Sequence, residues 1–246
     1  FYGGLVAWNT MPGAHLVNNS DFLEHSAAFV SMPITMFGMD AKVGVQGRRN
    51  TYVVANSHFD AGGLWTYAAG GPLLSTEFSP TADGTIHDVL FERLTVVDIN
   101  ADGLPLAIGC TSKGLRETHC AIRECRVARV VGVEGAQQAS TLHAIAVATG
   151  GVETLEVSRL NLEASGSFVD QSRGEGAMMV GTYGGTYGFV DTILIRDSKF
   201  LRNQAAYGGA INIGGSEADV VVERCFFEVG ALSHADRDTV GSTQTT

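Results

Sequence analysis

An eight-residue pattern that returns seven times constrains the fold of this chain more than any other feature. Within each copy, positions 3 and 8 are apolar, position 6 is small or apolar, and positions 4 and 5 form a polar or small pair. Because a unit repeated every few tens of residues cannot bury its own apolar face, it must stack on its neighbours. The seven copies occupy residues 15–22, 52–59, 89–96, 120–127, 155–162, 193–200 and 220–227.

The sixth copy shows how one repeat is built. Ile193 and Ile195 alternate with residues of the opposite face, and the alternation resumes over residues 198–200. Such alternation predicts strands with one buried face. The pair Arg196 and Asp197 shifts the phase, which predicts a corner that lets both halves of the motif point inward. We therefore predict an all-β chain, a right-handed parallel β-helix (solenoid) of about seven coils.

Two other folds fit this pattern less well. Antiparallel β-sandwiches and barrels show turn signals every 8–12 residues and hairpin pairs, not one motif at this longer spacing. Leucine-rich repeats are shorter and carry a leucine and asparagine framework that this chain lacks. Since coil length varies while the motif does not, the extra residues are expected in edge loops such as 71–87, 132–141 and 164–175. Loops of this kind form binding faces in many repeat proteins, or are simply tolerated.

The repeat runs through the chain without a break in composition, so residues 1–246 are expected to form a single β-helix segment. The chain opens on residues 1–8, which resemble the interior of later repeats, and it closes on the polar stretch 233–246. Solenoids usually carry polar capping units at their ends, and neither end has that character. We therefore expect this segment to be part of a longer protein.

Charge and hydropathy exclude two classes of partner. The 16 basic residues are scattered among 26 acidic ones, and the net charge is −10. Binding of nucleic acid requires clustered lysine and arginine, so no nucleic-acid partner is expected. No apolar run reaches the 18 residues typical of a transmembrane helix, and no membrane-spanning segment is expected.

One repeat resembles a known family. Phe200-Leu201-Arg202-Asn203, followed by Gly208-Gly209-Ala210-Ile211, resembles the paired FxxN and GGAI motifs of the chlamydial polymorphic outer membrane protein repeat family. The resemblance implies a right-handed β-helical passenger or stalk, display at the cell surface and, often, adhesion.

From the repeat and this resemblance we predict a structural or adhesive segment of an extracellular, cell-surface or filament-forming protein. Its partners are expected to be further copies stacked end to end, and a glycan or surface ligand at the edge loops. The alternative is a polysaccharide lyase or glycoside hydrolase built on a β-helix, which would need two carboxylates in one groove within reach of a sugar. We assign no catalytic, cofactor-binding or metal-binding residue, and no cofactor.

The outward charges at positions 4 and 5 alternate in sign between adjacent coils, which indicates a self-compensating strip rather than an active site. At position 6, the inward serines and cysteines are interpreted as packing residues and not as nucleophiles.

Asp98 opens a D-x-N-x-D-G stretch that resembles the start of a calcium loop, but it lacks the closing glutamate and is interpreted as a turn. Asn18 opens an Asn-Asn-Ser acceptor for glycosylation, and Cys110 and Cys120 are the pair of cysteines expected to form a disulfide, if one forms.

Overall fold

The computed structural model describes the strand-forming parts of the chain. These are residues 6–9, 14–23, 34–38, 49–60, 65–66, 74–78, 86–101, 108–112, 118–132, 145–147, 152–167, 177–181, 190–203, 210–214 and 218–229. Within these residues the secondary structure consists of β-strands, without a helix. The predicted all-β class is therefore confirmed for the described part of the chain. Of the expected edge loops, 71–87 was wrong in part, because it contains strand β8 (Leu74–Phe78) and the start of β9 (Ile86–Glu92), and 164–175 contains β17 (Gly166–Ser167). Most of their other residues and most of 132–141 lie outside the described part.

The strands form three sheets, named here A, B and C, and each takes one strand in turn as the chain advances. Sheet A consists of β1 (Val6–Asn9), β4 (Ile34–Gly38), β8 (Leu74–Phe78), β11 (Ile108–Ser112), β14 (Ile145–Val147), β18 (Met178–Gly181) and β21 (Ile211–Gly214). Sheet B consists of β2 (Ala14–Asn18), β5 (Arg49–Ala55), β9 (Ile86–Glu92), β12 (Thr118–Arg123), β15 (Val152–Ser158), β19 (Val190–Arg196) and β22 (Asp219–Glu223).

Sheet C holds the second half of each motif. It consists of β3 (Asp21–Leu23), β6 (His58–Asp60), β10 (Thr95–Ala101), β13 (Arg126–Gly132), β16 (Asn161–Glu163), β20 (Lys199–Asn203) and β23 (Phe226–Val229), with β7 (Trp65–Thr66) beside β10 and β17 (Gly166–Ser167) beside β13.

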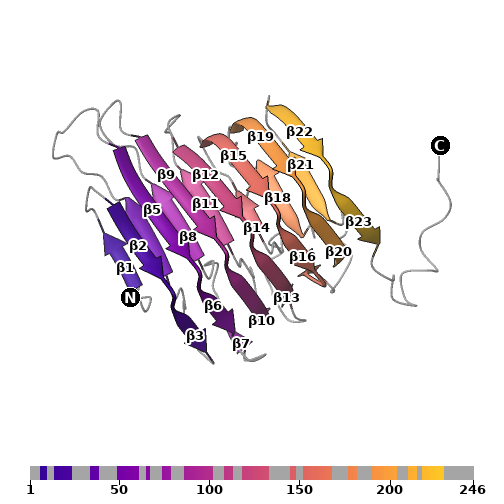
Figure 1. Cartoon of the computed structure of the whole chain (residues 1–246), viewed down its shortest axis with the longest axis horizontal. Helices are drawn as coiled ribbons and strands as arrows, with labels where there is room; N and C mark the ends of the chain where they lie inside the picture. Colours follow the sequence, from indigo (N-terminus) through magenta and orange to yellow (C-terminus); the bar gives the residue numbers. More distant parts are fainter. Residues whose placement is uncertain are drawn as a thin grey trace.

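Every strand pairing in the described residues is parallel, and equivalent motif positions pair with one another. Phe22 lies opposite Phe59, and Phe59 lies opposite Val96. Likewise, Val17 lies opposite Val54 in sheet B. Figure 1 shows the strands of each sheet side by side in chain order, from the indigo N-terminal strands to the yellow C-terminal ones. The sequence spacing between motif copies thus becomes the spacing between neighbouring strands.

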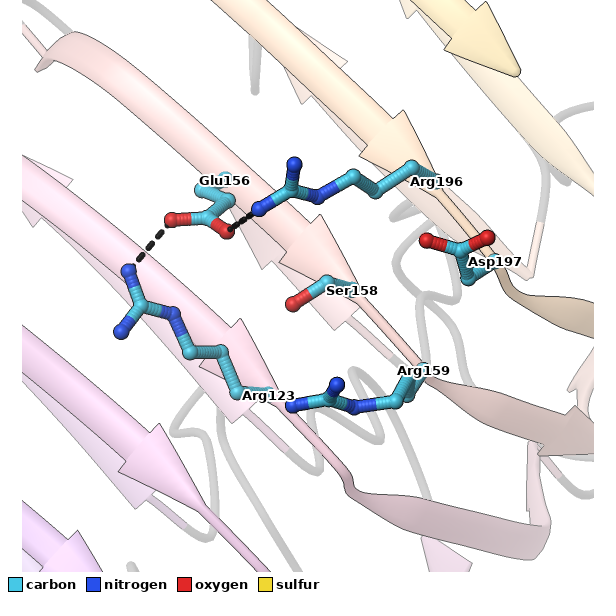
Figure 2. A pocket seen from close by; sticks show the side chains of 6 residues that line it. All are labelled: Arg123, Glu156, Ser158, Arg159, Arg196 and Asp197. Atoms are coloured by element: carbon cyan, nitrogen blue, oxygen red, sulfur yellow. Dashed lines mark hydrogen bonds and ion pairs between the residues drawn. The ribbon is translucent and has the colours of Figure 1, made fainter. Parts of the chain in front are cut away.

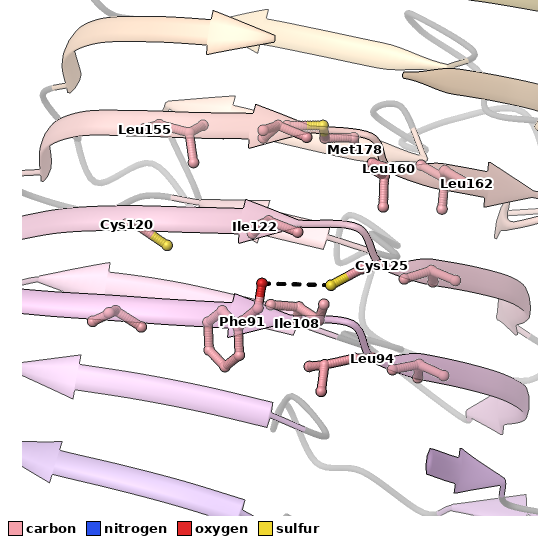
Figure 3. Packing of buried hydrophobic residues seen from close by; sticks show 14 of the residues in the cluster. Phe91, Leu94, Ile108, Cys120, Ile122, Cys125, Leu155, Leu160, Leu162 and Met178 are labelled. Carbon is pink, nitrogen blue, oxygen red and sulfur yellow. Dashed lines mark hydrogen bonds between the residues drawn. The ribbon is translucent and has the colours of Figure 1, made fainter. Parts of the chain in front are cut away.

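The core lies between the sheets and consists of the inward motif positions. In the five middle copies, positions 3 and 8 are fully buried. Position 3 is Val54, Phe91, Ile122, Val157 and Ile195, and position 8 is Phe59, Val96, Val127, Leu162 and Phe200. Figure 3 shows residues of these columns, with Phe91 and Ile122 on strands of sheet B and Leu162 on a strand of sheet C. The predicted inward orientation of both halves of the motif is therefore confirmed in the middle of the chain.

The corner between sheets B and C rests on an unusual backbone conformation at position 5. All seven residues there have a positive φ between 49° and 56°: Asn19, Asn56, Arg93, Glu124, Arg159, Asp197 and Arg224. Asparagine and aspartate tolerate this left-handed region, whereas arginine and glutamate adopt it at a cost. The cost is offset because the hydrogen bonds between coils continue through the corner. Glu124 N, for example, donates to Ser158 O at 2.9 Å.

Among the residues that the structure describes, four repeats contain a second left-handed residue, two positions after the motif ends. These residues are Asp98, Arg129, Ala164 and Arg202. Directly after Ala164, Ser165 N donates to the side-chain oxygen of buried Asn203 at 3.1 Å. Asn203 Nδ2 in turn donates to Leu162 O at 2.9 Å. Asn203 is the asparagine of the FxxN stretch, and its side chain satisfies backbone groups of the preceding coil.

Candidate functional site

The outer face of sheet B and its corner with sheet C carries a row of ion pairs, called here the charge strip and defined as motif positions 4 and 5 of the seven copies. Its members bond from one coil to the next. Arg224 Nε lies 2.7 Å from Asp197 Oδ1, and Arg159 forms an ion pair with Glu124. At the N-terminal end, where charges give way to amides, Asn56 Nδ2 donates to Asn18 Oδ1 at 2.7 Å. The self-compensating arrangement expected from the sequence is confirmed for these residues.

Glu156 is a charged residue of this face that the sequence reasoning did not single out. It lies at position 2 on β15, and it accepts hydrogen bonds from both Arg123 of β12 and Arg196 of β19. Figure 2 shows the carboxylate between the two guanidinium groups. A signal was available, because position 2 is otherwise apolar in every copy: Leu16, Val53, Leu90, Ala121, Leu194 and Val221.

Around Glu156 the outer face is hollowed into a pocket of about 450 Å³, called here the arginine pocket. Its lining consists of Arg123, Glu156, Ser158, Arg159, Arg196 and Asp197. Strands β12, β15 and β19 and the corners that follow them supply these side chains. Figure 2 shows Ser158 in the middle, with its hydroxyl facing the space between Arg123 and Arg159. Three successive coils therefore contribute to one concave polar site.

The two carboxylates of the arginine pocket are held in their charged form. Burial opposes ionisation of Glu156, but the hydrogen bonds from Arg123 and Arg196 outweigh it and lower the pKa of the carboxyl group. For Asp197, the hydrogen bond from Arg224 is the main cause of a lowered pKa. Both groups are therefore bases already satisfied by arginine, and neither is a protonated acid near neutral pH.

A second hollow of about 360 Å³ adjoins the arginine pocket and shares Arg123 and Glu156 with it. It extends toward the N-terminal strands, where an ion pair between Arg49 and Asp88 lies at its rim. His119 borders this hollow, and its Nδ1 lies 2.8 Å from Thr154 Oγ1. The two hollows together make a shallow groove that crosses five neighbouring strands of sheet B.

The inward serines and cysteines at position 6 have backbone partners. Ser57 Oγ donates to Ala55 O at 2.8 Å and accepts from Ser20 N at 3.2 Å. Cys125 is buried and contacts Phe91 O and Arg123 O, as Figure 3 shows for the first contact. Burial raises the pKa of Cys125 to about 12, so its thiol is not a nucleophile near neutral pH. These contacts agree with the interpretation of position 6 as structural.

The structure bears in part on the remaining candidate residues. Asn18 is exposed, as a glycosylation acceptor must be, and glycosylation there stays a prediction. Cys120 is buried and points into the core, but the side chain of Cys110 lies outside the described residues, so the disulfide also stays a prediction. Asp98 has a φ of 57°, and Arg129 donates to both of its carboxylate oxygens. The described residues of this stretch, 98–101, lie in strand β10, so the expected turn is not found there, and the Asp98 carboxylate instead forms an ion pair with Arg129 of the neighbouring strand.

The described residues contain neither a cluster of metal-binding side chains nor a membrane-spanning helix. There, no three side chains among histidine, cysteine, aspartate and glutamate come together in a way that could hold a metal ion. The same residues contain no helix with the length and apolar character needed to cross a bilayer.

Comparison of the chain with models of protein families, with curated proteins and with solved structures found no match.

Proposed function

We propose that this chain is a right-handed parallel β-helix of about seven coils that serves as a rigid scaffold in an extracellular or cell-surface protein. The observation that carries the proposal is the pairing of equivalent motif positions along each sheet, as for Phe22, Phe59 and Val96. A chain that adds one parallel strand to each of three sheets per repeat extends in one direction, and each coil contacts its neighbours. Continuous backbone ladders and buried side-chain columns make such an assembly stiff.

Side-chain stacking supports a rod-like scaffold. The rings of Phe22 and Phe59 are parallel within 4° at a centroid distance of 4.6 Å. Phe200 and Phe227 repeat this geometry at the other end, with 8° and 5.0 Å. The role of Asn203 in joining two coils is consistent with the proposed resemblance to the FxxN and GGAI repeats of the polymorphic outer membrane proteins.

Partners in this proposal bind at two places, the edge segments and the coil ends. The segments between motif copies differ in length while the motif is constant, which is the pattern of a scaffold that presents variable loops. At the C-terminal end, Val222 and Phe227 are 45% and 49% exposed although they occupy inward positions. Half-exposed core positions on the last described strands of the sheets support stacking of a further coil, which in a filament comes from another copy.

The alternative, a polysaccharide lyase or glycoside hydrolase, gains no support from the described residues. The arginine pocket does bring two carboxylates into one groove, as that alternative requires. However, the pKa of both groups is lowered by arginine, whereas a glycosidase needs one carboxylic acid whose pKa is raised so that it stays protonated.

Adhesion can be tested on beads coated with the purified protein, by counting the beads retained on extracellular matrix and on cultured cells. Replacing residues 133–144 or 168–176 by glycine-serine segments of equal length should reduce retention, because these segments connect strands and carry the variable residues. The matched control is R224Q, which alters the charge strip and no edge segment. Retention that survives both replacements, or release of sugar fragments from a panel of polysaccharides, would contradict the proposal.

The rod shape is tested separately by small-angle X-ray scattering over a range of concentrations. Seven coils at about 4.8 Å per strand give a core about 35 Å long, and end-to-end association should lengthen the particle without widening it. A particle that grows equally in all directions would contradict end-to-end stacking.

A further inference from the structure

The arginine pocket carries more positive than negative charge, in a protein whose net charge is −10. Its lining has three guanidinium groups and two carboxylates. Arg123 and Arg196 share the single carboxylate of Glu156, so one positive charge between them is not balanced by a partner of its own. Asp197 is bonded to Arg224 and Arg159 to Glu124, and both of these partners lie outside the lining, so their charges cancel in the balance of the site. The pocket is therefore a region of local positive charge on an otherwise acidic molecule, which favours an anion over a cation.

Two hydrogen-bond donors belong to residues that line the same space. Arg123 Nε is buried and, within the described residues, has no hydrogen-bond partner. Ser158 is only 5% exposed, and its hydroxyl is directed between Arg123 and Arg159. A buried N–H without an acceptor is unfavourable, and an oxyanion in the pocket would supply one. Guanidinium and hydroxyl groups together are typical ligands of carboxylates and related oxyanions.

We propose that the arginine pocket binds a carboxylate group carried by a small polar molecule about the size of one sugar acid. The volume of about 450 Å³ is in the range of small-ligand sites. A single negative charge matches the single excess positive charge of the lining, whereas a dianion such as sulfate would be repelled by Glu156 and Asp197. The site lies on a sheet face and not on the edge segments, so failure of ligand binding here would leave the proposed adhesion untouched, and failure of adhesion would leave this site untouched.

The probe is sodium D-glucuronate, titrated at low ionic strength and followed by the ¹⁵N–¹H signals of the arginine side chains. D-Glucose is the matched neutral ligand, because it replaces the carboxylate by a hydroxymethyl group. The Nε–Hε signal of Arg123 should shift in a saturable way with glucuronate and not with glucose. The signal of Arg93, which occupies motif position 5 outside the pocket, should not move.

Two substitutions change the affinity in opposite directions. R159Q removes a positive charge from the lining and should weaken glucuronate binding about tenfold, the usual scale for losing one charge-assisted contact. E156Q removes the competing carboxylate while keeping its shape, and it should tighten binding several-fold because Arg123 and Arg196 are released. R93Q, at the same motif position as Arg159, is the control and should leave binding unchanged.

Each result decides the proposal. Equal shifts with glucuronate, glucose and sodium chloride, or unchanged binding in both R159Q and E156Q, would overturn it. Tighter binding of sulfate than of glucuronate would overturn the assigned ligand class. If R159Q does not fold, R159K keeps the charge without the planar fork and should bind with intermediate affinity; full affinity in a folded R159K would contradict a role for the arginine fork.

Discussion

The middle coils and the last described coil carry the same motif but differ sharply in burial. Phe200 and Phe227 occupy position 8 and stack on one another, yet Phe200 is fully buried and Phe227 is 49% exposed. The same contrast separates Ile195 from Val222 at position 3. An inward side chain in this architecture is thus covered by the next coil, and not by its own strand. The burial of the core therefore depends on contact between neighbouring repeats, and a single repeat does not achieve it alone.

The largest expected loss of stability tests this difference in burial directly. F200A removes a buried ring between two coils and should lower the free energy of unfolding by about 3–5 kcal/mol. F227A removes a ring that is half in water and leaves no closed cavity, so its cost should be about 1–2 kcal/mol. Urea unfolding of both variants measures the difference. Equal losses would show that the last coil is covered in solution, for example by another copy.

The buried side chain of His87 makes the stability of the middle repeats depend on pH. His87 is 1% exposed, and burial lowers its pKa to about 4 against a small opposing effect of Asp88. The unfolded chain has a histidine pKa near 6.5, so it binds the proton first as the pH falls. Stability from neutral His87 is therefore complete above about pH 6.5 and is lost between about pH 6.5 and 4, by at most about 3 kcal/mol.

Urea unfolding at pH 7 and pH 4.5 tests this prediction. H87Q should flatten the pH dependence, because the group that titrates is gone. A slope that is the same in wild type and H87Q would contradict the assignment.

Position 6 offers a smaller test of the same contrast. Ser198 Oγ accepts from Leu160 N at 3.1 Å and donates to Arg196 O at 2.7 Å. S198A should cost about 1–3 kcal/mol, because it leaves a buried N–H without an acceptor. S198C should recover part of the loss, since cysteine occupies this position elsewhere. C225A, in the last coil, should cost under about 1 kcal/mol, and thermal unfolding of the three variants ranks them.

The smallest effect concerns the left-handed corner. Arg93 has a φ of 51°, a conformation that costs arginine about 1 kcal/mol and glycine almost nothing. R93G should therefore be neutral or stabilising by up to about 1 kcal/mol, despite the loss of its exposed ion pair with Glu92. R126G, in a strand, should be destabilising by about 1 kcal/mol. Equal destabilisation by both variants would show that the corner does not require a left-handed residue.

Much of the core could be read from the sequence, because alternation and a fixed repeat length identify which residues share a face. Val157 and Leu162, for example, were assigned inward from pattern alone and are fully buried. The left-handed conformation of Arg93 and Glu124 had no such signal, since neither residue favours it. Glu156 was visible as the charged exception at position 2, but its two arginine partners were not, because they come from coils on either side.

By itself, the sequence determined the strand period, the inward positions and the alternation of charge, since these follow from local geometry and from the need to bury apolar side chains. The tertiary structure decided which coils lie in contact, and with them the exposure of Phe227, the bridging of Glu156 and the excess charge of the arginine pocket. The physical reason is that each of these properties depends on contacts between side chains about 27 to 40 residues apart. Their juxtaposition is fixed only when one coil packs in register on the next.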